Sequence, residues 1–136
     1  MAGGGVDREA LSAALDEMDA AFAKVAEFDC ESLTTREHLA LLERFERWRR
    51  RIPAFEHPVI NAVARQATPE ELGGKLSHAI AEATLITRAE ASRRIKEAAD
   101  LGPRHGLTGE RLAPVLAATA AAQRDGTLGT GQVAVI

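Results

Sequence analysis

The segment that most constrains the fold of this chain is Thr87–Asp100, TRAEASRRIKEAAD. Thr87 and Glu90 have the spacing of a capping box, in which each side chain binds the backbone N–H of the other residue at the start of a helix. Small and apolar residues then recur at spacings of four and three, which predicts a helix with one buried face. That face consists of Ala91, Ile95 and Ala98. The side chains left for solvent or a groove are Arg88, Ser92, Arg93 and Lys96.

A shorter helical pattern, LSHAIAEATLI, precedes this segment, so the two together predict a helical hairpin near residues 75–100. Small buried residues and long donors near the N-terminus of the second helix are typical of a helix-turn-helix recognition helix. A plain αα-hairpin is the alternative, because helix-turn-helix turns favour glycine where this chain has Leu85. Even a true helix-turn-helix need not bind DNA.

The length of 136 residues favours one domain with a core of its own. Aromatic residues make up 4% and tyrosine is absent, which favours closely packed helices over a β-sandwich. The single cysteine, Cys30, excludes an internal disulfide. No signal-peptide pattern and no apolar run near the roughly 20 residues that span a bilayer are found, so we expect a cytoplasmic protein. We expect a disordered start at residues 1–5 and a single helical domain at residues 6–136.

Charge is distributed unevenly around the net value of −3. From Asp7 to Glu31 eight acidic residues stand against two basic ones, a balance of −6, whereas the rest of the chain has a balance of +3. The acidic segment could shield a basic face or simply be solvated. Its apolar residues recur at helical spacing and predict a helix from about Asp7 to Glu27, packed on the chain's own core or used for dimerisation. This first-helix stripe consists of Leu11, Leu15, Met18, Phe22 and Val25.

The next helix is predicted to start at a capping box formed by Thr34 and Glu37. Its apolar face consists of Leu41, Phe45, Trp48 and Ile52, and its arginines are Arg44, Arg47, Arg49, Arg50 and Arg51. The arginines suit phosphate binding, because guanidinium groups pair bidentately with phosphate oxygens. The alternative is a solvated face on which the arginines have Glu43 and Glu46 as neighbours.

Prolines and glycines predict the remaining boundaries. Pro53 is expected to stop or sharply bend the second helix, Pro58 to begin another, and His57 to be a turn or cap residue. Thr68–Glu71 predicts a short helix that ends at Gly73–Gly74, and helical spacing resumes over Lys75–Thr84. Further expected segments are a helix end at Leu101–Pro103, a loop over Arg104–Gly109 with His105 exposed, a helix from about Ala113 to Arg124, and the start of an apolar helix over Gly129–Ile136.

We therefore expect an all-α fold, a compact bundle of about six helices with a helix-turn-helix-like hairpin near residues 75–100. Three segments of the chain resemble the actinobacterial thirteen-E-twelve repeat family, over about Leu33–Ile136. They are RIPAFEHPVINAVARQATPEELG, LITRAEASRRIKEAADLGPRHGLTGE and LAPVLAATAAAQRDGTLGTGQVAVI. Members of that family have a helical N-terminal domain of unassigned function, often followed by an HNH endonuclease domain. The resemblance implies that this chain is an N-terminal part of a longer HNH-nuclease-type protein.

The nuclease motif of that family lies C-terminal to the matching region. Here the histidines are scattered and lack the clustering that would bind a divalent metal and activate water. They are His38, His57, His78 and His105. We therefore expect no catalytic residue, metal site or cofactor in this segment, a divalent metal belonging instead to the HNH domain.

The expected function is that of a non-catalytic helical domain for DNA binding or targeting, with duplex DNA as the partner. The residues expected to contact phosphates or base edges are Arg88, Arg93, Arg94 and Lys96, with Arg47, Arg50 and Arg51 as a second patch. The alternative is a module for protein–protein interaction or oligomerisation, such as a homodimer, that uses the first-helix stripe and the apolar end near Val133. A stand-alone enzyme is disfavoured, since no nucleophile and base stand at a recognisable spacing.

Overall fold

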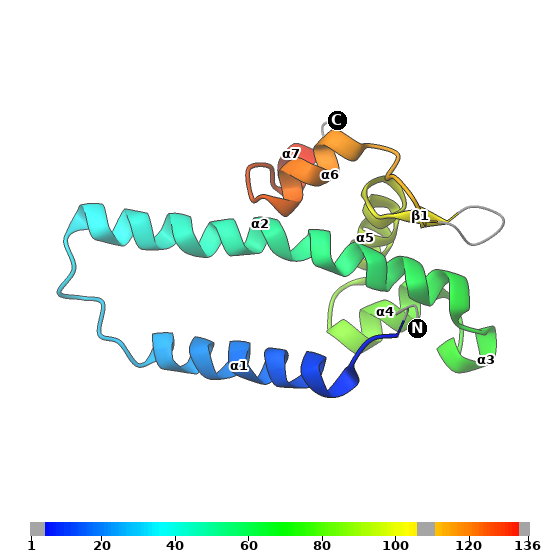
Figure 1. The fold of residues 1–136 in the computed structure, drawn as a ribbon, viewed down its shortest axis with the longest axis horizontal. Helices are drawn as coiled ribbons and strands as arrows, with labels where there is room; N and C mark the ends of the chain where they lie inside the picture. The colour runs from blue at the N-terminus through cyan, green and yellow to red at the C-terminus, as the bar shows by residue number, and fades with distance from the viewer. Residues whose placement is uncertain (1–4, 106–110, 134–136) are drawn as a thin grey trace. The chain divides into compact units, whose positions relative to one another are not determined.

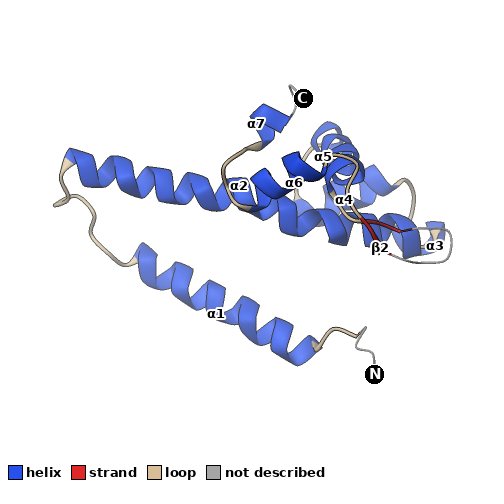
Figure 2. Ribbon diagram, turned by 45° about the horizontal axis from the view of Figure 1, so that its top comes forward, coloured by secondary structure: helices blue, strands red, loops and turns tan. Residues whose placement is uncertain are grey.

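The computed structural model describes residues 5–105 and 111–133. The fold is all-α, as the sequence predicts: in these two ranges the regular structure consists of seven helices and one pair of two-residue strands (Figure 1). Figure 2 shows how small the strand content is beside the helices. Packing divides the chain into two units, Met1–Ala40 and Leu41–Ile136.

The first unit contains α1 (Arg8–Ala26), whose bounds confirm the predicted first helix. The helix starts at Asp7, where the carboxylate accepts a hydrogen bond from the Ala10 N–H at 3.0 Å. None of the residues of α1 is buried. The side chains of the first-helix stripe are between 39% (Val25) and 75% (Phe22) exposed. Residues 5–40 of this unit therefore supply no core for the apolar face of α1.

Helix α2 (Thr35–Gln66) begins at the predicted capping box. The Thr34 hydroxyl accepts from the Glu37 N–H at 3.2 Å, and the Glu37 carboxylate accepts from the Thr34 N–H at 3.0 Å. The helix then continues without interruption through Pro53 and Pro58, so the predicted break and restart at these prolines are wrong.

Contacts on both sides of the prolines explain why the helix continues. An internal proline removes a backbone hydrogen bond and costs roughly 3 kcal/mol, which tertiary contacts can offset. Before the prolines, the Arg50 side chain donates from Nε to the Gly126 carbonyl at 2.6 Å. After them, Asn61 donates from Nδ2 to the Ala98 carbonyl at 2.9 Å. The helix is therefore fixed to other elements of the second unit on either side of the weak point.

Two short helices follow α2. Thr68 and Glu71 form a complete capping box for α3 (Pro69–Leu72), and the helix ends at Gly73 with φ of 70°. Helix α4 spans Leu76–Thr84. Both helices confirm the boundaries expected from the sequence.

Helices α4 and α5 (Arg88–Leu101) pack together and confirm the predicted helical hairpin. Leu85 ends α4 in the left-handed conformation, with φ of 59° and ψ of 40°. The Ile86 N–H donates back to the Ala81 carbonyl at 3.2 Å, which closes the turn. A leucine therefore takes the backbone conformation that a glycine adopts at lower cost.

The start of α5 differs from the prediction in one detail. Thr87 accepts from the Glu90 N–H at 3.0 Å, but the reciprocal bond of a capping box is not made, because the Glu90 carboxylate binds Arg93 and Arg94 instead. On the predicted buried face, Ala91 and Ala98 are fully buried. Ile95 is only half-buried.

Helix α5 ends at Gly102, as predicted, although for a reason that the sequence does not show. Its φ of −81° is open to any residue, but a side chain there would collide with the Asn61 amide and the Ala98 carbonyl. The close approach of α2 therefore requires the glycine.

The segment after α5 is less helical than predicted. Arg104–His105 forms β1, which pairs antiparallel with β2 (Arg111–Leu112), so the predicted loop is wrong at its first two residues. The rest of that loop, residues 106–109, lies outside the described part of the chain. Helix α6 spans Ala117–Arg124 and begins four residues later than expected, because β2 and the bond from the Leu116 N–H to the Asp100 carbonyl hold the intervening backbone.

Helix α7 (Thr130–Val133) follows a turn at Gly126 and lies within the predicted C-terminal helix. Residues 134–136 of that prediction lie outside the described ranges. Within the second unit, both views show α5 and α6 beside α2 (Figures 1 and 2). Side-chain contacts from α2 to α5 and α6 hold this arrangement.

Candidate functional site

One face of α5 presents polar side chains to solvent. Arg88, Ser92 and Lys96 are exposed and recur at intervals of four residues, so they form one stripe along the helix. We call these three residues the α5 stripe. Ala89, which is also exposed, adds little bulk beside it. The opposite face holds the buried Ala91 and Ala98, so the stripe points away from the body of the unit.

Arg93 and Arg94, two other predicted DNA contacts, are held in ion pairs on α5. Arg93 donates to Glu90 at 2.6 and 2.9 Å and to Glu97 at 3.0 Å. Arg94 donates from Nε to Glu90 at 2.9 Å. The hydrogen bonds from Arg93 and then Arg94 lower the pKa of Glu90 to about 2, and the same pairing raises the pKa of Arg93. These two guanidinium groups therefore already have anionic partners.

The second predicted patch lies on α2. Arg47 donates from Nη2 to both carboxylate oxygens of Glu43, at 2.9 and 3.0 Å, as the solvated-face alternative expects. Arg50 also pairs with Glu43 at 3.5 Å, and it donates from Nε to the Gly126 carbonyl, as Arg51 does to the Arg124 carbonyl. The α2 arginines therefore attach the end of α6 and the turn after it to α2, a role that the sequence pattern did not indicate.

A buried polar cluster links α2, α5 and α6. Glu97 is 7% exposed and His57 is 2% exposed, and the His57 Nε2 atom lies 3.0 Å from the Glu97 carboxylate. Gln123, which is fully buried, donates from Nε2 to the same carboxylate oxygen at 3.2 Å. The prediction that His57 is a turn or cap residue is therefore wrong. No spacing signal could have found this cluster, because His57 and Glu97 are 40 residues apart.

The ionisation of Glu97 decides how this cluster is bonded. Burial raises its pKa, but the hydrogen bonds from His57 and Gln123 and the charge of Arg93 outweigh burial, so the pKa is lowered overall. Glu97 is therefore a carboxylate at neutral pH. Because a carboxylate only accepts hydrogen bonds, the His57 Nε2 atom must carry the proton.

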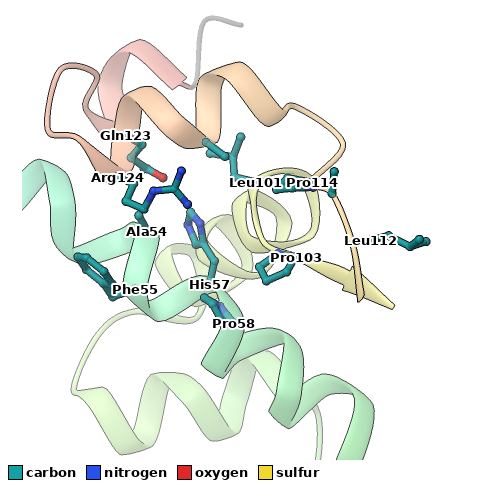
Figure 3. A pocket seen from close by; sticks show the side chains of 12 residues that line it. Ala54, Phe55, His57, Pro58, Leu101, Pro103, Leu112, Pro114, Gln123 and Arg124 are labelled. Atoms are coloured by element: carbon teal, nitrogen blue, oxygen red, sulfur yellow. The ribbon is translucent and has the colours of Figure 1, made fainter. Parts of the chain in front are cut away.

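Beside this cluster the surface is hollowed (Figure 3). The hollow has a volume of about 540 Å³ and is lined mainly by apolar side chains from α2, α5 and the segments after it. His57, Gln123 and Arg124 are its polar members. The Gln123 Oε1 atom is a buried acceptor without a hydrogen-bond partner among the described residues.

Metal binding finds no support in the described part of the chain, where no group of three or more histidine, cysteine, aspartate or glutamate side chains could hold an ion. Of the other histidines, His38 has its Nε2 atom 2.6 Å from the Cys30 carbonyl. The side chain of His105 is outside what the structure describes. Across the same described ranges, no helix has both the length and the apolar character needed to cross a bilayer.

The helical hairpin, with Arg88 and Lys96 on its outer face, and the buried polar cluster define a small helical domain. Residues 39–136 match the family model described as Domain of unknown function (DUF222). The chain belongs to this family. The match begins inside α2 and therefore includes the hairpin, the polar cluster and the hollow.

Several relatives of the chain are mycobacterial proteins. Uncharacterized protein Rv1702cMb1728c of Mycobacterium tuberculosis is 56% identical over 129 residues, which is 95% of this chain and 28% of the relative. Uncharacterized protein Rv1128c of the same species is 50% identical over 129 residues, 95% of this chain and 29% of the relative. Uncharacterized protein Mb1179c of Mycobacterium bovis is 55% identical over 122 residues, 90% of this chain and 27% of the relative.

The chain thus spans less than a third of the length of these relatives. No solved structure shows significant similarity to it.

Proposed function

We propose that this domain is a non-catalytic DNA-binding or targeting domain of a cytoplasmic HNH-endonuclease-type protein of the thirteen-E-twelve repeat family. The observation that carries the proposal is the α5 stripe, which presents two cations on the outer face of the second helix of a helical hairpin. In DNA-binding hairpins the second helix enters the major groove, and its first residues contact bases and phosphates. Any divalent metal for cleavage would belong to the HNH domain.

The predicted DNA contacts should contribute unequally to the free energy of DNA binding, because only some of their side chains are already paired with acids. Neither Arg88 nor Lys96 makes an ion pair with any residue that the structure describes. Ser92 between them and Ala89 beside them are small enough for the helix to lie close to a groove. Arg93 and Arg94 would have to share their donors with Glu90. We therefore expect Arg88 and Lys96 to contribute more binding free energy than the other predicted contacts.

A salt series with duplex DNA tests the proposal. The double variant R88A/K96A is compared with K24A/R36A, which removes the same charge from exposed positions in the first unit. Each phosphate contact that is lost should reduce the slope of log affinity against log salt by about 1. R88A/K96A should therefore lower both affinity and slope, whereas the control should change them little. Equal effects of the two double variants would show non-specific attraction and would refute the α5 stripe as the site.

An interaction or oligomerisation module is the second candidate. It is favoured by the first-helix stripe, which is exposed within its unit and has the heptad-like spacing of a helix–helix seam. Sedimentation equilibrium of the chain and of the variant L15E/F22E would test it. A concentration-dependent dimer that the variant abolishes supports this candidate, and a strict monomer that binds DNA removes it.

A further inference from the structure

We propose that the hollow beside His57 and Gln123 is a nucleotide site, in which the base packs on the apolar wall, an N–H of the base donates to Gln123 Oε1 and the phosphate pairs with Arg124. The hollow has an apolar wall, one unpaired acceptor and one cation among its lining residues. This site is separate from the α5 stripe. Leu101 is the α5 residue that lines the hollow, and it lies on the buried side of the helix, whereas the α5 stripe lies on the exposed side.

The apolar wall suits a flat ring. Pro58, Pro103 and Pro114 contribute their rings to the lining, and Phe55 contributes an aromatic side chain that is 56% exposed (Figure 3). Flat aromatic and proline side chains are surfaces on which bases stack. The volume of about 540 Å³ lies within the usual range for small-molecule sites.

The unpaired acceptor Gln123 Oε1 indicates that the ligand carries a hydrogen-bond donor. Gln123 is fully buried, and its Nε2 group is already bound to Glu97, which fixes the orientation of the amide and turns Oε1 to the other side. The Oε1 atom then has no partner among the described residues, an arrangement that is rare for buried polar atoms. The accessible surface of this atom is below 1 Å², so a ligand N–H satisfies it only when a lining side chain moves aside. Every nucleobase carries such a donor.

The guanidinium group of Arg124 indicates that the ligand also carries an anionic group. Arg124 follows Gln123 directly on α6, lines the same hollow and is exposed. Its backbone carbonyl is held by Arg51, whereas its guanidinium makes no ion pair within the described residues. Guanidinium groups pair bidentately with phosphate oxygens. A base and a phosphate on one molecule would therefore occupy both polar ends of the hollow.

Calorimetric titration with deoxyadenosine monophosphate tests the site, with deoxyadenosine and deoxyribose 5-phosphate as probes that lack one half of the ligand. The variants are R124A, F55A and Q123M, with R49A as the control because Arg49 is an exposed arginine of α2 outside the hollow. We expect R124A to weaken the nucleotide about tenfold, the loss of one charge-assisted pair, and to bind it no better than deoxyadenosine. F55A and Q123M should weaken both base-containing probes, and R49A neither. Circular dichroism checks that Q123M is folded, and F55A tests the base contact if it is not.

The outcomes are separable. The site would be overturned if deoxyribose 5-phosphate bound as tightly as the nucleotide, or if R124A and R49A had the same affinity for the nucleotide. It would also be overturned if no binding were detected at millimolar nucleotide. An oligodeoxyadenylate strand distinguishes the two sources of the same chemistry. If the strand binds more tightly than the monophosphate and R124A weakens it, the ligand is a nucleotide of single-stranded DNA. If only the monophosphate binds, the ligand is a free nucleotide. R88A/K96A should leave nucleotide affinity unchanged, so the site stands or falls independently of duplex binding.

Discussion

Replacing Glu97 by glutamine would test whether one buried carboxylate holds α2, α5 and α6 together. Its two oxygens accept from His57 at 3.0 Å, from Gln123 at 3.2 Å and from Arg93 at 3.0 Å. Glutamine carries no charge and keeps a single acceptor oxygen, so all three contacts are kept only if His57 changes its tautomer and Gln123 turns its amide over. Removing one partner from a buried ionic network costs about 3–5 kcal/mol. We expect E97Q to lose that much free energy of unfolding at neutral pH.

Urea unfolding followed by circular dichroism measures this loss. The matched control is E46Q, since Glu46 pairs with Arg49 on the surface of α2 with both side chains more than half exposed. The control should change the free energy of unfolding by less than about 0.5 kcal/mol. A loss below about 1 kcal/mol in E97Q would refute the reasoning, because it would mean that the charge of Glu97 contributes little to holding the three helices together.

Two further predictions concern the helical hairpin. L85G should raise the free energy of unfolding by about 0.5–1 kcal/mol, because a left-handed leucine costs about 1–2 kcal/mol and the freedom of glycine in the unfolded chain returns part of it. The control A99G, at an exposed helical position of α5, should lower it by about 1 kcal/mol, and a loss in both variants would show that Leu85 has packing contacts. The pKa of Glu90 is lowered from 4.5 to about 2, so the ion pairs of Glu90 should be lost, and with them stability, as pH falls from 4.5 towards 2. The expected loss is about 1–2 kcal/mol, because solvent screens a side chain that is one-third exposed. Urea unfolding at pH 7 and pH 3 should therefore show a smaller loss for E90Q than for the unsubstituted chain, and equal losses would contradict the pairing.

Much of the fold could be predicted from the sequence, because helix starts depend on neighbouring residues. The capping boxes at Thr34 and Thr68 form as predicted. At Thr87 the same pattern forms only half of the box, because Arg93 and Arg94 compete for the Glu90 carboxylate. The capping-box spacing therefore predicts which groups can donate and accept, but other residues of the helix determine which of these hydrogen bonds form.

The candidate site was less predictable. Arg88 and Lys96 point to solvent as expected, since small residues on the opposite face orient the helix. The roles of Arg50 and Arg51 in holding Gly126 and Arg124 depend on residues more than 70 positions away, which no local pattern encodes. The Gln123 acceptor is equally invisible in an alanine-rich segment.

The sequence by itself therefore determined the helical class and most helix boundaries, since caps, spacing and glycine stops act over a few residues. Only the tertiary structure decided that α2 continues through Pro53 and Pro58, that Gly102 is required by the approach of Asn61, and that His57 is buried against Glu97. In each case the deciding contact joins residues far apart in the chain. Its free energy exists only once the helices have packed, so it outweighs a local preference without leaving a local signal.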